Sequence, residues 1–510
     1  MRRLPVILAV LLGGATLLPV WLLPHFPGQD TPNHLYALHV ASRVDAAPFV
    51  SHFRPTLSGT NVAFLGLGRL FAPLVGVEAA HRLFLSLYLL AFLLGALYLA
   101  GSLDRRRWPL GLLAVPLAFN WYLGTGLYNF VATIPIYCFA VGLMLRHPHL
   151  PLRALAALAG LGFLATLGHP LALLTLGASA LAVLPTFRAW VRAGVALVPP
   201  LGLVLLGLGR AAGPSGFEWP RGFAGPVYSL ATGYYRSLLP VSTSELPTAI
   251  AFSVLLLGAC ALALRPSRRA ALPRPAFRLS LLLFGLLLLL PERSFDFDHI
   301  STRMAGFLWL SLLLWGDLEG LLARPRLLAG VALVLGVGSV GLFARSARAV
   351  ERDLAEYTAG ISHVRPRATL LPITFDGRGA PGRVTWPLLH AWGYYGLARD
   401  TLSPYVLYAA AHRPASLLAY RVTSQVPFPF DEEWADRIAS GRFCGARARK
   451  TEGAFDCRPV EKEAWRQFVG AACRYDYVLA WAAPVELAAQ LDRCFVPTFA
   501  AGRLGIYRHR

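Results

Sequence analysis

Long apolar runs, separated by short stretches rich in arginine and proline, fill the first two thirds of the sequence. A helix that crosses the hydrocarbon core of a bilayer needs about 20 apolar residues, and lengths of about 17 to 25 are tolerated. The pattern therefore predicts an α-helical polytopic membrane protein with about eleven transmembrane helices. The predicted spans are residues 4–23, 81–101, 108–123, 128–145, 152–167, 170–187, 193–209, 248–264, 277–291, 304–321 and 327–344.

The apolar run from Asn61 to Gly76 is interpreted differently, because it carries Arg69 and Pro73. Counting it as a span would place Arg105 to Arg107 outside the cell, against the positive-inside rule. As a helix lying in the membrane interface, it leaves every short arginine-rich loop on one side. The amino terminus is then cytoplasmic, and the predicted extracytoplasmic segments are residues 24–80, 210–247, 292–303 and everything after about 345.

The chain changes character after residue 344, where acidic residues become frequent and short apolar runs alternate with polar stretches. The runs 368–373 and 475–481 predict buried strands, and the segment from Pro484 to Leu491 predicts a helix whose proline suits the first turn. We therefore expect a transmembrane domain over 1–344, with interfacial helices in the first outer loop, and a C-terminal extracytoplasmic α/β domain over 345–510.

Four of the six cysteines, Cys444, Cys457, Cys473 and Cys494, lie in this tail. In an extracytoplasmic domain they predict two disulfide bonds, and the sequence leaves their pairing open. A zinc site is the alternative, although the tail has no C-x-x-C pair.

The composition agrees with a membrane protein and excludes an ordinary soluble domain, since the 510 residues are 56% hydrophobic and only 15% charged. The formal net charge is +21, but the arginines that produce it cluster in short loops between apolar spans. We interpret this charge as a determinant of topology and expect membrane lipids, not nucleic acid, among the partners. The predicted location is the bacterial inner membrane.

The segment Gly28 to Tyr36 follows the first span directly and places a carboxylate at the membrane surface. Asp30 or Thr31 followed by Pro32 is also a good helix start, so a purely structural capping role is the alternative. A helix from about Pro32 would place Asp30 and His34 one turn apart, facing the same direction. We predict that Asp30 and His34 are catalytic.

The order of a first span, an outer loop with an acidic residue just past the membrane, interfacial helices, many further spans and an outer C-terminal domain resembles the GT-C superfamily of polyprenyl-phosphate-dependent glycosyltransferases. The resemblance implies a catalytic base or metal-site ligand at Asp30, a lipid-linked sugar donor, and a cell-envelope glycan, lipid or protein as acceptor. The sequence lacks the WWD-type motif of oligosaccharyltransferases and the paired Asp-Glu of protein O-mannosyltransferases. Those two branches are therefore disfavoured.

Sugar transfer from a lipid phosphate also needs cations or hydrogen-bond donors that stabilise the leaving phosphate. Arg303, His299 and Arg236 in the later outer loops are the candidates, and His169 and Asn129, at outer turns between spans, are further candidates for substrate binding. For the arginines the alternative is contact with lipid headgroups, and for His169 it is a local bond to the backbone at Pro170.

Three other motifs carry weaker predictions. The spacing of Asp296 and Asp298 leaves a divalent metal open as a cofactor, with a solvated turn as the alternative. Gly336 to Gly341 matches G-x-G-x-x-G inside the last span, where it predicts close helix packing and no dinucleotide site. The segment from His390 to Tyr395 is either an acceptor contact or plain core.

The predicted function is sugar transfer by a membrane enzyme, and two alternatives remain. A non-catalytic protein of envelope assembly would carry Asp30 and His34 as a solvent-exposed helix cap. A transporter or flippase would carry ionisable residues near the midplane and two related halves, and the sequence shows neither.

Overall fold

The computed structural model describes residues 3–56, 60–208, 217–219, 225–268, 272–294, 297–406, 409, 418–432, 434–439 and 458–510. Its contacts divide the chain into two compact units. The helical unit contains Met1–Phe26 and Leu57–Ala347, and the mixed unit contains Pro27–Thr56, Arg348–Ala411 and Ser416–Arg510. Most of the first outer loop up to Thr56 thus groups with the C-terminal part of the chain, which the sequence analysis did not anticipate.

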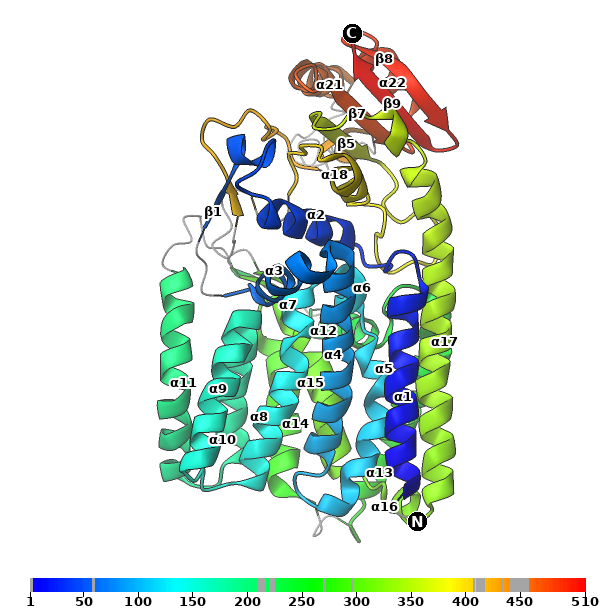
Figure 1. The fold of residues 1–510 in the computed structure, drawn as a ribbon. Helices are drawn as coiled ribbons and strands as arrows, with labels where there is room; N and C mark the ends of the chain where they lie inside the picture. The colour runs from blue at the N-terminus through cyan, green and yellow to red at the C-terminus, as the bar shows by residue number, and fades with distance from the viewer. Residues whose placement is uncertain are drawn as a thin grey trace, which may run out of the picture. The chain divides into compact units, whose positions relative to one another are not determined.

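The helical unit is built from apolar helices that run roughly alongside one another (Figure 1). Within the described residues, six of them are long and apolar enough to cross a membrane: Arg3–Leu22, Val77–Ala100, Tyr128–Arg146, Phe187–Leu205, Thr243–Ala263 and Pro325–His363. The prediction of an α-helical polytopic membrane protein is therefore confirmed, while the count of eleven spans stays a prediction.

The elements of the helical unit are as follows. Its helices are α1 (Arg3–Leu22), α3 (Ala63–Val75), α4 (Val77–Ala100), η2 (Arg105–Ala114), α5 (Val115–Ala118), α6 (Trp121–Thr125), α7 (Tyr128–Val131), α8 (Thr133–Arg146), α9 (Leu152–Gly168), α10 (Pro170–Val183), α11 (Phe187–Leu208), α12 (Gly225–Leu238), η3 (Thr243–Glu245), α13 (Leu246–Ala263), α14 (Arg274–Leu289), α15 (Ile300–Trp315), α16 (Glu319–Leu322) and the larger part of α17 (Pro325–Thr358). A small antiparallel sheet is formed by three two-residue strands, β2 (Phe217–Glu218), β3 (Arg293–Ser294) and β4 (Phe297–Asp298).

Several predicted spans differ from the observed helices, and two differences bear on the fold. The predicted span 108–123 is broken into η2, α5 and α6, because Pro109 and Pro116 each remove a backbone donor that a continuous helix would need. The last predicted span ends at 344, but α17 continues to Thr358, and the division between the two units falls inside this helix. Its added turns lie in the mixed unit, where Asp353 and Glu356 both pair with Arg503.

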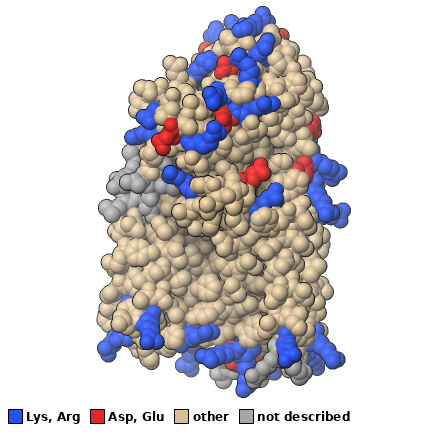
Figure 2. Space-filling model, in the orientation of Figure 1, with Lys and Arg blue, Asp and Glu red and all other residues tan. Residues whose placement is uncertain are grey.

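The sides of the helical unit present apolar side chains to their surroundings, as a bilayer-embedded surface requires. Figure 2 shows this flank almost free of charge, with basic residues, all of them arginines, gathered at one end of the unit. On α3, the predicted interfacial helix, Leu70 and Leu74 are exposed beside Arg69. The chain is a multi-pass membrane protein.

The glycines of the G-x-G-x-x-G match serve helix packing at its start. A Cβ on Gly336 would lie 2.7 Å from the side chain of Leu12 in α1, and a Cβ on Gly338 would lie 3.0 Å from Thr248 in α13. Such distances are shorter than side chains tolerate, so glycine allows α17 to approach its neighbours closely.

The mixed unit contains a four-stranded sheet in the order β5-β7-β9-β8. β5 and β7 are parallel, with Leu371 opposite Val478, and the remaining pairs are antiparallel. β5 and β7 are buried along their whole length, as the apolar runs predicted. The elements of this unit are α2 (Thr31–Ser42), η1 (Phe49–Ser51), β1 (Phe53–Pro55), η5 (Ile361–His363), β5 (Leu370–Thr374), α18 (Gly393–Arg399), β6 (Leu418–Tyr420), α19 (Trp434–Ala439), α21 (Arg458–Ala472), β7 (Tyr477–Trp481), α22 (Val485–Leu491), β8 (Phe495–Ala501) and β9 (Leu504–His509).

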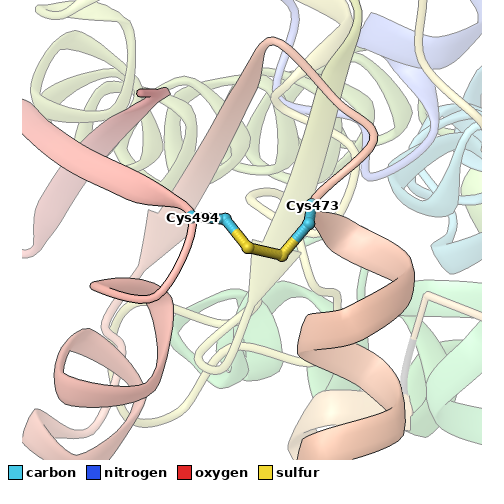
Figure 3. The surroundings of a disulfide bond; sticks show 2 residues. All are labelled: Cys473 and Cys494. Carbon is cyan, nitrogen blue, oxygen red and sulfur yellow. A yellow bond between two sulfur atoms is a disulfide. The ribbon is translucent and has the colours of Figure 1, made fainter.

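One face of this sheet carries the core of the mixed unit. Phe468 of α21 and Leu487 of α22 pack with the inward side chains of β5 and β7. A disulfide between Cys473 and Cys494 joins the end of α21 to the start of β8 (Figure 3). The prediction of disulfide bonding is confirmed for this pair, and Cys444 and Cys457 lie outside the described residues.

The helix α18 packs directly on α2 because two glycines remove the side chains between them. A Cβ on Gly393 would lie 2.4 Å from the carbonyl oxygen of Pro32, and a Cβ on Gly396 would lie 2.4 Å from the ring of Tyr36. Tyr36 is fully buried, and its hydroxyl donates a hydrogen bond to the carbonyl of Thr401 at 2.5 Å, so its ring has little freedom to move. This close approach brings the segment before α18 next to the start of α2.

Replacing Gly393 by alanine is expected to destabilise the mixed unit, because the new methyl group collides with backbone that cannot rotate away. Overpacking of this kind costs about 1–3 kcal/mol. The matched control is Gly470→Ala in α21, where a Cβ meets nothing within 4 Å and removing glycine from a helix is expected to stabilise slightly. Thermal unfolding of the detergent-solubilised chain measures both, and equal melting temperatures would contradict the close packing of α18 on α2.

Candidate active site

Asp30 occupies the N-cap position of α2, as the sequence predicts, with Pro32 in the first helical turn. Its backbone angles are helical, at φ −90° and ψ −1°, and its carboxylate makes no capping hydrogen bond to the first turn of the described helix. The residue is only 8% exposed. A buried carboxylate needs partners other than water, and those partners come from distant parts of the mixed unit.

The carboxylate of Asp30 and that of Glu432 lie on opposite sides of one imidazole ring. His390 Nδ1 lies 2.8 Å from Oδ1 of Asp30, and His390 Nε2 lies 3.0 Å from Oε2 of Glu432. His390 is held in this position because it precedes α18, which packs on α2 through Gly393. The three side chains form a chain of hydrogen bonds across the mixed unit.

The electrostatics of this cluster favour a charged histidine. Burial alone would lower the pKa of His390, but the negative charge of Glu432 and the hydrogen bonds to Asp30 and Glu432 outweigh burial and raise the pKa to about 10. His390 therefore carries a proton on each nitrogen at neutral pH and donates one hydrogen bond to each carboxylate.

Further hydrogen bonds hold both ends of the cluster. Trp392 Nε1 donates to Oε1 of Glu432 at 2.8 Å, so each oxygen of that carboxylate has a donor. At the other end the side-chain amide of Gln29 donates to Oδ1 of Asp30 at 3.4 Å, and its oxygen accepts from the backbone N–H of Trp386 at 3.1 Å. Oδ1 of Asp30 is thus fixed by two donors.

His34, the second predicted catalytic residue, lies one turn along α2 from Asp30. Its backbone N–H donates to the carbonyl of Asp30 at 2.8 Å, and its side chain is 3% exposed. The two residues share a helix, as the sequence indicates, and the catalytic role of His34 stays a prediction.

Sequence reasoning missed the partners of Asp30. His390 was recognised only as an acceptor contact or core residue, and Glu432 was not recognised at all. The separation in sequence between Asp30 and His390 is 360 residues. No local pattern reports such a pairing, and the only hint was a histidine beside buried-type aromatic residues in an otherwise apolar stretch.

In the helical unit, two predicted substrate-binding residues share one carboxylate. Arg236 donates to Oε1 of Glu292 at 2.6 Å and to Oγ1 of Thr302 at 2.7 Å. His299 Nδ1 lies 2.9 Å from the same Oε1. The positive charge of Arg236 is therefore compensated within the protein.

Arg303 and His169 form a separate pair. Arg303 Nη1 donates to Nε2 of His169 at 2.6 Å, and the guanidinium lies over the ring of Phe130, 4.8 Å from its centre. The residue is 4% exposed, and no carboxylate among the described residues forms an ion pair with it. Among the described residues, Arg303 is thus buried without a direct ion pair, and Glu292 and Asp298 act on its charge only from farther away.

A small cavity lies beside this arginine. It is lined by polar side chains that include Asn120, Tyr122 and Arg303, together with apolar side chains such as Phe307 and Leu310. Its volume of about 10 Å³ has room for about one water molecule. A lipid phosphate is larger, so its binding here would require the lining side chains to move.

The side chain of Asn129 contacts the start of α3. Its side-chain oxygen accepts a hydrogen bond from the backbone N–H of Phe64 at 2.8 Å, which satisfies a free donor in the first turn of α3. The predicted role of Asn129 in sugar binding is left without support by this bond and stays a prediction.

The described side chains do not fit a metal centre at Asp30. Both nitrogens of His390 face carboxylates at hydrogen-bond distance, so the ring has no lone pair directed at an ion. Over the described ranges, no group of three or more His, Cys, Asp or Glu side chains is arranged to hold a metal. Asp296 of the predicted Asp296–Asp298 motif lies outside the described residues, and no chemical step is derived through a metal.

Comparison with known proteins gives matches in fold only. No protein-family model matches the chain, and no curated protein sequence matches it. Among solved structures, ArnT from Cupriavidus metallidurans bound to undecaprenyl phosphate matches with a TM-score of 0.51 and 12% identity, over 99% of this chain and 97% of ArnT. A mutant form of the arabinofuranosyltransferase AftD from Mycobacteria matches with a TM-score of 0.47 and 16% identity, over 100% of this chain and 41% of AftD. The chain is therefore similar to ArnT in fold, which agrees with the architecture predicted from the sequence.

Proposed function

We propose that this chain is an integral membrane glycosyltransferase that moves a sugar from a polyprenyl-phosphate-linked donor to a cell-envelope acceptor, with Asp30 as the general base. The observation that carries the proposal is the buried carboxylate of Asp30, held by the imidazolium of His390 and not used as a helix cap. The fold supports the choice of donor, because the similar structure of ArnT holds undecaprenyl phosphate.

The proposed chemistry uses the carboxylate for proton transfer. A hydroxyl of the acceptor attacks the anomeric carbon of the sugar, the bond to the lipid phosphate breaks, and Asp30 takes the hydroxyl proton. The positive charge of His390 lies beside the carboxylate of Asp30 and favours its ionised form, which can accept a proton. His34, one turn away on the same helix, is proposed as the second catalytic residue.

Arg303 is the proposed contact for the phosphate of the donor. Its charge is buried without a carboxylate partner in the described chain, whereas the charge of Arg236 is compensated by Glu292. A phosphate would supply the missing negative charge, and arginine binds it through two parallel hydrogen bonds. Arg236, His299 and His169 are proposed to support this site by holding the side chains around it.

The proposed location is the bacterial inner membrane, with a cytoplasmic amino terminus and the mixed unit on the outer side. Arginines in the short loops favour this orientation. The disulfide between Cys473 and Cys494 supports it independently, because disulfides persist in oxidising compartments.

Among the alternatives, a non-catalytic protein of envelope assembly predicts an exposed cap at Asp30. The burial of Asp30 and its bond to His390 speak against that prediction. A flippase predicts movement of the lipid across the bilayer without chemical change, which the following experiment distinguishes.

The test uses the purified full chain in lipid nanodiscs with polyprenyl phosphates that carry a panel of radiolabelled pentoses and hexoses, in the presence of cell-envelope extract. We expect the label to leave the organic-soluble donor and to appear in the acceptor, with release of one polyprenyl phosphate for each sugar transferred. A well-folded protein that transfers no sugar from any donor would contradict the proposal and favour the assembly alternative. Movement of intact donor between leaflets of sealed vesicles would favour the flippase.

A further inference from the structure

We propose that His390 and Glu432 are positioning residues for the proposed base, with Glu432 holding His390 as an imidazolium and His390 fixing the carboxylate of Asp30. The catalytic part of this inference rests on the proposed function. The arrangement of the three side chains does not depend on it.

The geometry requires a proton on both nitrogens of His390. Each nitrogen lies within 3.0 Å of a carboxylate oxygen, Asp30 on one side and Glu432 on the other. A neutral imidazole donates from only one nitrogen and would direct the lone pair of the other at a negative oxygen. Among the described residues, Asp30 at the start of α2 and Glu432 before α19 are the charged groups that face the ring.

Glu432 is itself held in a fixed orientation. One of its oxygens accepts from Trp392, which is fully buried and packs edge-on against both Tyr36 and His390. A hydrogen-bonded chain therefore runs from Trp392 through Glu432 and His390 to Asp30. The side chains of Asp30, His390 and Glu432 are at most 13% exposed, and Trp392 is buried. Water therefore has little access to replace these hydrogen bonds.

These hydrogen bonds, which run from Trp392 through Glu432 and His390, would act on Asp30 in two ways. They hold Oδ1 in place and so restrict rotation of the carboxylate about its last bond. This matters for catalysis because a misplacement of about 1 Å in a reacting group can cost about 100-fold in rate. They also place a positive charge beside the carboxylate, which favours the ionised form that accepts a proton.

The pH dependence follows from the raised pKa of His390. The ordinary histidine pKa is 6.5 and the folded value is about 10, because the charge of Glu432 and the bonds to both carboxylates outweigh burial. The stabilisation from this group is fully present below pH 6.5 and is lost as the pH rises through about 10. Activity that depends on the imidazolium would fall over the same alkaline range.

The test replaces Glu432 by glutamine, which keeps an oxygen for Trp392 and presents an amide N–H to His390. The ring then loses the charge of Glu432, so its pKa should fall, and it still donates to Asp30. We expect kcat for sugar transfer to fall about 10- to 100-fold and the alkaline limb of the pH–rate profile to move down by at least one pH unit. Matched controls are Glu486→Gln, at an exposed position of α22, and His363→Gln, at an exposed position outside the cluster, and both should leave rate and profile unchanged.

A second readout separates failure of this inference from failure of the proposed function. The melting temperature of the wild type should drop between pH 7 and pH 9.5, and E432Q should show a smaller drop because the pKa of its His390 lies closer to the ordinary value. If E432Q is poorly folded, the double variant H390Q/E432Q removes both charges together and should have no alkaline limb in this range. Transfer activity with the same pH profile in wild type and E432Q would overturn the inference alone. An absence of transfer in every protein would overturn the proposed function, and parallel melting curves would then overturn the protonated histidine as well.

Discussion

Asp30→Asn is expected to lower kcat for sugar transfer by about 100- to 10,000-fold, the range typical of removing a general base. Asparagine has nearly the same shape and keeps a side-chain oxygen that can accept the hydrogen bond from His390. What it loses is the ability to take a proton from the acceptor hydroxyl. The measurement is single-turnover transfer of labelled sugar from the donor identified in the nanodisc assay.

The control is Asp492→Asn, which makes the same chemical change at an exposed position after α22. It should retain wild-type activity and stability. If Asp30→Asn transferred sugar as fast as the wild type, Asp30 would not be the base, whatever the chain's activity. A large loss of activity together with a large drop in melting temperature would instead assign the residue a structural role.

Some of the fold follows from the sequence because its signal is local. Apolar length predicts α1 and α4 to within a few residues, and the apolar runs of the tail predict β5 and β7. The predicted helix boundaries are wrong where prolines interrupt an apolar run or where contacts with distant parts of the chain extend a helix. Prolines broke the span predicted over 108–123, and contacts in the mixed unit extended α17 beyond the end of its apolar run.

In the candidate site, too, one residue is predicted from local sequence, whereas its partners depend on contacts between distant segments. Asp30 was found because a carboxylate next to a membrane span is unusual within a short window of sequence. Glu432 and His390 were not found as its partners, since the sheet of the mixed unit and the glycines of α18 bring them together from far along the chain. The neutralisation of Arg236 by Glu292 was equally invisible, because the sequence shows that both residues exist but not that they touch.

Arg236 has a carboxylate partner, whereas Arg303 has no direct ion pair in the described part of the chain. The second large expected effect follows from this difference. Arg303→Gln should reduce kcat/KM for the lipid-linked donor by about 100- to 1,000-fold, as loss of a group that stabilises developing charge does. Its melting temperature should stay the same or rise, because the variant removes a buried charge that has no carboxylate partner in the described part of the chain. Donor titrations in nanodiscs, paired with thermal unfolding in the absence of donor, measure the two effects separately.

Arg236→Gln should behave in the opposite way, because it removes the permanent cation from the partly buried carboxylate of Glu292 and leaves only His299 and Ser301 as its partners. Breaking such a pair by removing one partner costs about 3–5 kcal/mol, so the melting temperature should fall clearly. Arg69→Gln, at an exposed position of α3, is the control for loss of an arginine as such and should change neither quantity. If Arg303→Gln lost stability while its kcat/KM for the donor stayed near the wild-type value, the charge of Arg303 would not be a phosphate site. A folded Arg303→Gln chain that no longer responds to the donor, beside an Arg236→Gln chain that is unstable but still responds, is the outcome that assigns the phosphate to Arg303.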